Sequence, residues 1–382
     1  MRTSSLHFCT SDSWGGLELY ACTLMSELKK AGTSVSAICK HGSKIEEFLK
    51  AHDIQYAHLP VHSPLSLNSV RFVRSLIDRH RIDCVHVHYH SDIWTASLSL
   101  RGDKERKLFL SVYMGVGRKK DIWHRFIYRR LDGLFTSSPE FNRRLPQLYP
   151  VSKEKIHLLP YGRLLGLYVA DDAKRRAVRS QLGLSPQQFL VGSLGRIDPG
   201  KGVMEFMESF LYLEQHLQEN VKYLIVGEPT RRGNAKPGES PYEPHCEEYF
   251  RQLQKFVAEH NLNEKMHFAG FQEDVIGYLS AMDVFIFPSR DELYSLAMLD
   301  AMAMGLPIVA AGASGNLLQI RDGENGLLFK VADGRDLAEK LSTYLASQEL
   351  RKKHGIAARR FVEENHDMKE IIARLLRFYQ ES

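Results

Sequence analysis

The chain has 382 residues, more than one ordinary hydrophobic core accommodates, so we expect two domains. Its hydrophobic content of 43% and charged content of 25% are typical of a soluble globular protein. No uninterrupted apolar stretch approaches the roughly 18 residues of a membrane-spanning helix. The N-terminus turns polar within a few residues, unlike a secretory signal, so we expect a cytoplasmic protein.

The five cysteines are scattered and include no C-x-x-C pair. This spacing argues against a disulfide framework and against a cysteine-based metal site. It predicts buried thiols in a reducing compartment.

The net charge of +5 is concentrated in one segment. Residues 101–144 carry twelve Lys or Arg and five Asp or Glu, a local charge of +7. Within it, "GRKKDIWHRFIYRR" mixes cations with Trp123, Phe126 and Tyr128. Two interpretations stay open: a solvated helix with an apolar stripe toward the core, or a helix that docks on an anionic membrane or a phosphorylated acceptor. The segment lacks a nucleic-acid recognition motif, so we expect no nucleic-acid partner.

In the first half, short β-branched or aromatic runs alternate with longer amphipathic runs, which predicts βα units and a mostly parallel sheet. The first helix is predicted from Leu17, Ala21, Leu24 and Leu28 on one face, with Gly32 ending it. Strands are predicted at residues 5–9, 35–39, 54–58, 84–88, 108–113, 134–138 and 156–160.

The same alternation then restarts. Between the halves, residues 161–188 read as an irregular stretch with Gly and Pro near its ends, which we interpret as a hinge. The chain closes with an amphipathic helix from about residue 366. We therefore expect an α/β fold with two Rossmann-like, doubly wound domains that face each other across a cleft. The second set of strands is predicted at residues 189–195, 222–228, 266–271, 283–288, 307–312 and 326–331.

The loop after the first of these later strands resembles a phosphate-binding loop. Residues 195–201 fit G-x-x-x-x-G-K, but Gly202 stands where nucleoside triphosphatases have the Ser or Thr that binds Mg²⁺. The guanidinium of Arg196 and the ammonium of Lys201 can themselves neutralise a diphosphate. The pattern therefore favours an anion site without a metal, and a P-loop phosphohydrolase is the weaker alternative.

A second candidate for a phosphate site follows the first strand. Gly15 and Gly16 stand just before a predicted helix, where glycines allow close backbone approach and the helix N-terminus offers free N–H groups. A flexible turn is the competing interpretation.

Two acids accompany a later helix. Glu292 precedes it and Asp300 follows eight residues on, roughly 12 Å along a helix. The helix N-terminus at residues 293–295 is a further anion seat. The sequence around Asp300 is apolar, so this carboxylate is expected to need a partner.

Three histidines, His86, His88 and His90, are predicted on one side of a strand end. A metal triad and a packed or acceptor-binding role are both open. No acid or cysteine at ligand spacing supports the metal, so we favour the second interpretation and expect no metal site.

Taken together, these residues resemble a family 4 glycosyltransferase of the two-domain (GT-B) type over nearly the whole chain. The resemblance rests on Gly15 and Gly16 with Glu18, and on three longer blocks. These are "GRIDPGKG" for the family's G-R-x-x-x-x-K-G, "ELYSLAMLDAMAMGLPIVA" for its E-x₇-E block and "SGNLLQIRDGENGLLF" for its G-G-x-x-E…D-G-x-N-G-x-L run.

The resemblance implies transfer of a sugar, with retained configuration, from a nucleotide-sugar donor (UDP- or GDP-sugar) to a hydroxyl of a glycan or lipid-linked acceptor. It implies that the enzyme needs no cofactor and no metal. It also implies a role in lipopolysaccharide, surface polysaccharide or other glycoconjugate assembly. Residues 1–165 would bind the acceptor and residues 166–365 the nucleotide-sugar, with helix 366–382 packed on the first domain. The basic segment would hold the enzyme on the inner face of the plasma membrane.

The resemblance also assigns residues. Arg196, Lys201 and Glu292 would be catalytic, the two cations on the diphosphate and Glu292 on the sugar, while Asp300 would contact the ribose hydroxyls. His88, His90 and Met114 are acceptor-side candidates. The donor-binding residues would be Gly15, Gly16, Gly195, Leu293, Tyr294, Ser295, Leu296 and Asp300.

The chain departs from the family pattern at several positions. Asp300 is one methylene shorter than the family's Glu, Met114 replaces a His, and Leu318 replaces the Glu of G-G-x-x-E. Leu293 and Ser295 replace two glycines near the sugar, which predicts a changed donor choice. These departures leave open a degenerate transferase fold that serves as a nucleotide-sugar scaffold or sensor.

Overall fold

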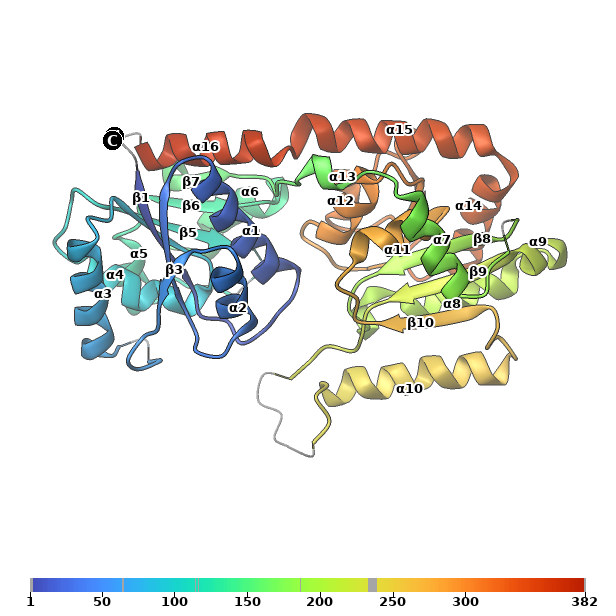
Figure 1. Ribbon diagram of the computed structural model, residues 1–382, viewed down its shortest axis with the longest axis horizontal. Helices are drawn as coiled ribbons and strands as arrows, with labels where there is room; N and C mark the ends of the chain where they lie inside the picture. Colours follow the sequence, from blue (N-terminus) through green and yellow to red (C-terminus); the bar gives the residue numbers. More distant parts are fainter. Residues whose placement is uncertain are drawn as a thin grey trace. The chain divides into compact units, whose positions relative to one another are not determined.

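The computed structural model describes residues 3–63, 65–113, 115, 117–185, 187–232 and 239–380. The chain divides into two compact units, Met1–Gly162 with Met368–Ser382, and Arg163–Asp367. Each unit contains one parallel β-sheet, and each predicted strand overlaps an observed one (Figure 1).

The first unit has a seven-stranded sheet in the order β3-β2-β1-β4-β5-β6-β7. All neighbouring strands are parallel, and the order reverses between β1 and β4. The helices form two contacting groups, α1 with α2 and α16, and α4 with α3 and α5. The strands are β1 Ser4–Cys9, β2 Ser34–Cys39, β3 Gln55–Ala57, β4 Cys84–Val87, β5 Lys107–Val112, β6 Gly133–Thr136 and β7 Ile156–Leu158. The helices are α1 Gly16–Lys30, α2 Lys44–Ala51, α3 Leu67–Arg79, α4 Ile93–Ser99, α5 Ile122–Tyr128, α6 Pro139–Leu148 and α16 Met368–Gln380.

The second unit has a six-stranded sheet in the order β10-β9-β8-β11-β12-β13, also parallel throughout. Its core includes the stacked rings of Phe206 and Tyr223, with Val191 and Ile286 from the central strands. The strands are β8 Phe189–Leu194, β9 Val221–Val226, β10 Met266–Gly270, β11 Val284–Phe287, β12 Ile308–Ala311 and β13 Leu327–Phe329. The helices are α7 Asp172–Gln181, α8 Val203–Tyr212, α9 Gln215–Asn220, α10 Pro244–Glu259, α11 Val275–Ala281, α12 Leu296–Ala303, α13 Asn316–Gln319, α14 Gly334–Ala346 and α15 Gln348–Asn365.

The periodicity of the first helix and the last one is confirmed. In α1, Ala21, Leu24 and Leu28 are buried, and Gly32 follows the helix with a φ of +93°, where glycine stops it at little cost. In α16, Leu375 and Tyr379 are among the buried residues, and this helix contacts α1 in the first unit.

The interpretation of residues 161–188 as irregular is wrong for α7. This helix shows few apolar residues, so periodicity gave no signal. Ionic contacts hold it instead: Arg175 and Arg179 bind the carboxylate of Asp283 at 2.6 and 3.1 Å. Arg175 also donates to the carbonyl oxygens of Ser280 and Ala281 at the end of α11.

All five cysteines are buried and free. Among the described residues, none of the helices combines the length and the hydropathy that crossing a membrane would require.

A buried carboxyl group fixes the chain where it leaves β1. Asp92 is 5% exposed and accepts hydrogen bonds from the hydroxyl and the backbone N–H of Thr10, at 2.5 and 3.1 Å. Burial raises the pKa of Asp92 to about 7, although both hydrogen bonds oppose the shift. The carboxyl group therefore titrates near neutral pH while it holds the start of the loop that leads to Gly15.

We expect Asp92 to contribute stability to the first unit that is lost as the pH rises from about 4 to about 7. Because the folded-state pKa of Asp92 exceeds its unfolded value, the folded chain keeps a proton that the unfolded chain releases in that window, a contribution to the slope of up to about 1.4 kcal/mol per pH unit. The buried histidines of the same unit have lowered pKa values and act in the opposite direction. Asp92→Asn should remove the Asp92 contribution alone, so the free energy of unfolding of the variant should rise more steeply with pH than that of wild type. Urea unfolding followed by tryptophan fluorescence isolates the first unit, because all three tryptophans, at positions 14, 94 and 123, belong to it. Equal slopes in wild type and variant would contradict the prediction.

Candidate functional site

In the second unit, the predicted donor residues gather where the strand order reverses. Strands β8 and β11 are neighbours, and the chain leaves their carboxyl ends in opposite directions along the sheet. Ligands of doubly wound sheets bind at such a switch point. Residues 195–201 follow β8, and residues 288–295 follow β11.

The loop after β8 differs from a nucleoside triphosphatase loop in its backbone. Residues Pro199–Lys201 form a single 3₁₀ turn, in which the Asp198 carboxylate accepts the N–H of Gly200 at 3.0 Å. Gly202 is left-handed, with a φ of +69°, and a Cβ there would lie 2.2 Å from the carbonyl oxygen of Pro288. A Ser or Thr side chain has no room at this position, which argues against the phosphohydrolase alternative.

Lys201 and Glu292 meet across this switch point. The Lys201 ammonium forms an ion pair with Glu292 Oε1, and the Ser289 hydroxyl donates to the same oxygen at 3.2 Å. The two side chains are 23% and 21% exposed, so both can reach solvent. The cation expected on the diphosphate and the acid expected on the sugar therefore neutralise each other in this structure.

Arg196 lies on the same loop and is exposed. Within the described part of the chain it makes no hydrogen bond or ion pair. The neighbouring backbone is fixed, since the N–H groups of Gly195 and Ile197 donate to the carbonyl oxygens of Val226 and Glu228. The backbone on both sides of Arg196 is thus fixed at the switch point, while its side chain extends into solvent.

The loop after β11 is clamped by α13. The Gly315 N–H donates to the Glu292 carbonyl oxygen at 2.8 Å, and a Cβ on Gly315 would lie 2.3 Å from the carbonyl oxygen of Leu293. Gln319 is fully buried; its Oε1 accepts the Ser295 N–H at 2.8 Å and its Nε2 donates to the Ser295 carbonyl oxygen at 3.0 Å. The sequence analysis missed Gln319, although it adjoins Leu318, the position of the family glutamate.

Three of the predicted donor-binding residues at the start of α12 already have partners. Ser295 is the N-cap, and its hydroxyl oxygen accepts the N–H of Met298 at 3.1 Å. The Tyr294 hydroxyl shares a hydrogen bond of 2.8 Å with His366 Nε2, and burial raises the pKa of Tyr294. The Leu296 carbonyl oxygen accepts from Arg163 Nη2 at 3.1 Å. An anion was expected to bind the free N–H groups at this helix N-terminus. Two of these groups, those of Ser295 and Met298, already donate to side chains of the protein.

Asp300 has the partner that its apolar surroundings predicted. Arg163 Nε lies 2.6 Å from Asp300 Oδ1, and the Tyr168 hydroxyl donates to the same oxygen at 2.5 Å. Burial raises the pKa of Asp300, opposed by the charge of Arg163 and the hydrogen bond from Tyr168. Neither partner was predicted. The need for a cation beside a buried carboxylate was the only signal, and it does not say which arginine supplies it.

In the first unit, Gly15 and Gly16 are exposed at the start of α1. Glu18 organises this turn: its carboxylate accepts the Gly15 N–H at 3.1 Å and the Ser11 hydroxyl at 2.9 Å. The glycines thus present their backbone to solvent on a fixed turn.

The prediction that three histidines share one side of a strand end is wrong for His90. Strand β4 ends at Val87, and His90 begins a 3₁₀ turn in which its Nε2 bonds the Tyr128 hydroxyl at 2.7 Å. His88 instead shares a 2.9 Å hydrogen bond with His7, a residue that sequence reasoning missed. The sequence held no signal for this contact, because it follows from the pairing of β1 with β4, which sets His7 opposite His86.

These buried imidazoles form a closed network. His86 bonds the Tyr379 hydroxyl at 2.6 Å and the Ser111 hydroxyl at 2.8 Å, and His88 bonds the Tyr113 hydroxyl at 2.6 Å. Burial lowers the pKa of His7 to about 3 and holds those of His86 and His88 well below the usual range. All three rings are therefore neutral packing groups at physiological pH.

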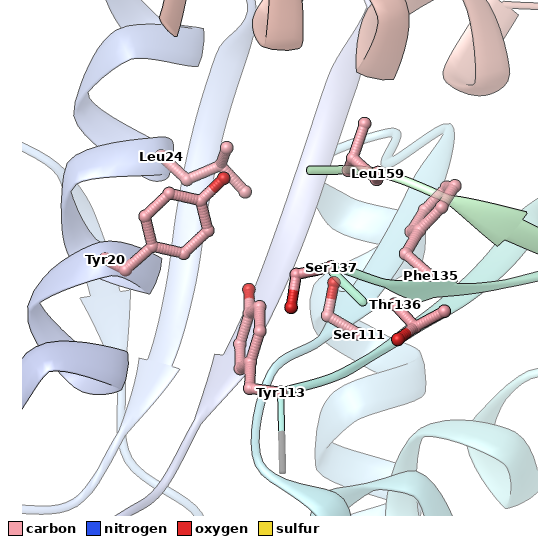
Figure 2. A pocket seen from close by; sticks show the side chains of 8 residues that line it. All are labelled: Tyr20, Leu24, Ser111, Tyr113, Phe135, Thr136, Ser137 and Leu159. Atoms are coloured by element: carbon pink, nitrogen blue, oxygen red, sulfur yellow. The ribbon is translucent and has the colours of Figure 1, made fainter. Parts of the chain in front are cut away.

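Tyr113 also borders a small cavity between α1, β5 and β6 (Figure 2). Its volume is about 10 Å³, room for about one water molecule and too small for a sugar. Met114, the acceptor-side candidate next to Tyr113, lies outside the described residues.

Comparison with known proteins agrees with this geometry. The chain matches the family model of glycosyl transferases group 1 over residues 174–361 and that of Glycosyltransferase Family 4 over residues 14–163. It is 27% identical over 285 residues to a D-inositol 3-phosphate glycosyltransferase of Nocardia farcinica, a match that covers 74% of this chain and 57% of that protein. The chain spans about half the length of the curated relatives it matches.

Solved structures share the fold over the full length. One is HepE of Anabaena in complex with UDP and glucose, with a TM-score of 0.80 at 17% identity and 100% coverage of both chains. Another is a glycosyltransferase from Rickettsia africae, with a TM-score of 0.83 at 18% identity, covering 100% of this chain and 98% of that one. The two parallel-sheet units thus have the GT-B architecture, and with a family model matched in each unit, the chain belongs to the family 4 glycosyltransferases.

Proposed function

We propose that the protein transfers a sugar from a nucleoside-diphosphate donor to a hydroxyl acceptor, with retained configuration and without a bound metal. The observation that carries the proposal is the Lys201–Glu292 pair at the switch point, on the loop that also carries the exposed Arg196. Family membership supports the reaction type.

Donor binding exchanges one ion pair for another. The diphosphate brings negative charge to the switch point, so the Lys201 ammonium turns from Glu292 to the phosphate oxygens, and Arg196 adds a second cation. Glu292 is then free to accept hydrogen bonds from sugar hydroxyls. The backbone N–H group of Gly16 is the proposed phosphate contact in the first unit, because that of Gly15 already donates to the Glu18 carboxylate.

The reaction breaks the bond between the anomeric carbon and the donor phosphate oxygen and forms one to the acceptor oxygen. The acceptor proton passes to the departing phosphate, so no enzyme carboxylate acts as nucleophile. Arg196 and Lys201 stabilise the charge that develops on the leaving diphosphate, usually the largest contribution to catalysis of this kind.

The nucleoside is proposed to sit toward Asp300. Its Oδ1 is engaged by Arg163 and Tyr168, so Oδ2 is the oxygen proposed for the ribose hydroxyls. UDP-sugars are the first donors to test, because UDP is the nucleotide named for the Anabaena structure.

The acceptor is proposed to be a glycan or a lipid-linked glycan at an anionic membrane, in lipopolysaccharide or surface polysaccharide assembly. Helix α5 supports a membrane docking face, since the apolar side chains of Ile122, Trp123 and Phe126 are 76%, 68% and 47% exposed. The helix also turns an apolar side toward the core, since Ile127 and Tyr128 are buried, so both interpretations of this segment stay open. Cations surround these side chains along the chain: Arg118, Lys119, Lys120, Arg125 and Arg129.

Arg130 is not part of that face. It donates to the Leu100 and Arg106 carbonyl oxygens and pairs with Asp132 at 2.7 Å, with 16% of its side chain exposed. Its charge reversal would damage the fold rather than test docking.

Lys201→Ala should lower kcat/KM by about 10²–10³-fold, because it removes a cation from the developing diphosphate charge. Isothermal titration with UDP and a panel of nucleotide sugars should show weakened binding as well. Lys353→Ala, at an exposed position of α15 in the same unit, is the matched control and should behave as wild type. Unchanged turnover in the Lys201 variant would contradict the assignment of Lys201 to the diphosphate.

Glu292→Gln separates sugar contact from phosphate contact. Because Glu292 competes for Lys201 in the free protein, the variant should bind UDP at least as tightly as wild type. Its transfer rate should nevertheless fall by at least about tenfold, since the proposed sugar contact is lost. Equal losses in UDP binding and turnover would contradict these separate roles. Tight UDP-sugar binding by the wild type, with no transfer or donor hydrolysis across many acceptors, would favour the scaffold alternative.

The docking face is tested by sedimentation with vesicles containing anionic lipid. Wild type should pellet at low salt and be released at high salt, as screening predicts. Lys119→Glu with Lys120→Glu should reduce partitioning at least about tenfold, because each cation near an anionic surface contributes about 1 kcal/mol. Arg71→Glu with Arg79→Glu, at exposed positions of α3, makes the same charge change elsewhere. Equal losses in both double variants would point to net charge rather than to this face.

A further inference from the structure

Three side chains in the first unit converge at the carboxyl ends of the edge strand β3 and its neighbour β2. His41 follows β2, His58 follows β3, and Glu46 stands in the first turn of α2 between them. Strands β2 and β3 pair in parallel, with Ile38 opposite Ala57, so both histidines leave the sheet at the same edge.

The distances within this cluster suit a metal ion better than hydrogen bonds. Glu46 Oε2 lies 3.6 Å from His41 Nδ1 and 3.4 Å from His58 Nε2, beyond the usual 2.7–3.2 Å of an N–H···O bond. A tetrahedral Zn²⁺ with ligands at about 2.0–2.2 Å separates its ligand atoms by about 3.3–3.6 Å. The three ligand atoms all lie within 4.8 Å of one another.

The chemistry of the cluster is incomplete without such an ion. Glu46 is 4% exposed, and His58 Nε2 is buried with no hydrogen-bond partner among the described residues. Other groups fix the carboxylate, since Lys50 binds Oε1 at 2.7 Å and the Gly42 N–H donates to Oε2 at 2.6 Å. Such contacts orient a ligating carboxylate in metal sites.

We propose that His41, Glu46 and His58 form a binding site for a divalent cation of the zinc class. Two imidazoles and one carboxylate are a known ligand set for zinc, with a fourth position left for water. His41 is 83% exposed, so that position faces solvent. The ion would tie α2 to the ends of β2 and β3, independently of nucleotide-sugar binding in the second unit.

Two other clusters have metal-ligand composition but fit less well. The ring nitrogens of His7, His86 and His88 are already hydrogen-bonded to one another or to hydroxyl groups. In the second unit, the Cys246 thiol donates to Asp198 at 3.5 Å beside His245, and burial raises its pKa, so it stays protonated. The thiolate that a metal needs is disfavoured there.

The experiment uses full-length, tag-free protein, stripped with a chelator and dialysed against micromolar Zn²⁺ at about pH 7.5. We expect one zinc per chain, measured by mass spectrometry of the metal. Affinity on the order of micromolar is expected, because the site has three protein ligands and stands next to the Lys50 cation. Co²⁺ in place of Zn²⁺ should give the visible absorption of a tetrahedral site.

His41→Ala and His58→Ala should each weaken zinc binding at least about tenfold. His80→Ala, at an exposed position of the same unit, and His245→Ala, at the competing cluster, should bind as wild type. Zinc should also raise the unfolding midpoint reported by tryptophan fluorescence in wild type but not in His58→Ala, whose metal-free fold is checked by circular dichroism. Absence of zinc from wild type, binding unchanged in both ligand variants, or binding lost in His245→Ala would overturn the proposal.

Discussion

The candidate site depends on the ion pair between Lys201 and Glu292. About a fifth of each side chain is exposed, and such pairs contribute little net stability, roughly 0–1 kcal/mol when solvated. In the proposed function, a ligand with two phosphate charges would therefore meet a cation that is easily released. The pair also compensates the charge of the Glu292 carboxylate. A weak interaction suits a group that must change partners, whereas a fully buried pair would resist the exchange.

The positions of the two partners are set by backbone contacts rather than by the pair itself. Gly202 lets the loop after β8 rest against Pro288, and Gly315 lets α13 rest against the residues after Glu292. The side-chain amide of Gln319 hydrogen-bonds both the backbone N–H and the carbonyl oxygen of Ser295. The two glycines allow close backbone contacts, and the buried amide of Gln319 adds two hydrogen bonds. Together these contacts fix the backbone of both loops. Such rigidity is what electrostatic stabilisation needs, because fixed charges cost no reorganisation during the reaction.

The sheets were predictable from the sequence because their strands are short apolar runs separated by helical periodicity, a signal that is local. The switch-point loops were predictable because their residue types suit anions. Partners brought in from distant segments were not, as Gln319, Arg163 and His7 show: each depends on which elements pack together. Helix α7 escaped detection for a related reason, since arginine contacts to Asp283 hold it and an apolar stripe does not. The partners of the histidines could not be predicted either. Sequence spacing groups His90 with His88, but the turn after β4 gives them different hydrogen-bond partners.

The two acids of the E-x₇-E block differ in a way that spacing does not reveal. Glu292 is bound to a lysine on a long flexible stem, whereas Asp300 is bound to Arg163, whose side chain is 9% exposed. Arg163 also donates its backbone N–H to the His366 carbonyl oxygen at 2.7 Å and bridges in parallel with Asp367. The chain passes between the units at residues 162–163 and again at 367–368, so Arg163 ties both crossings to α12 through Leu296 and Asp300. In this chain the second acid of the block anchors the helix beside the site, and that anchoring accounts for its burial whether or not a ribose reaches Oδ2.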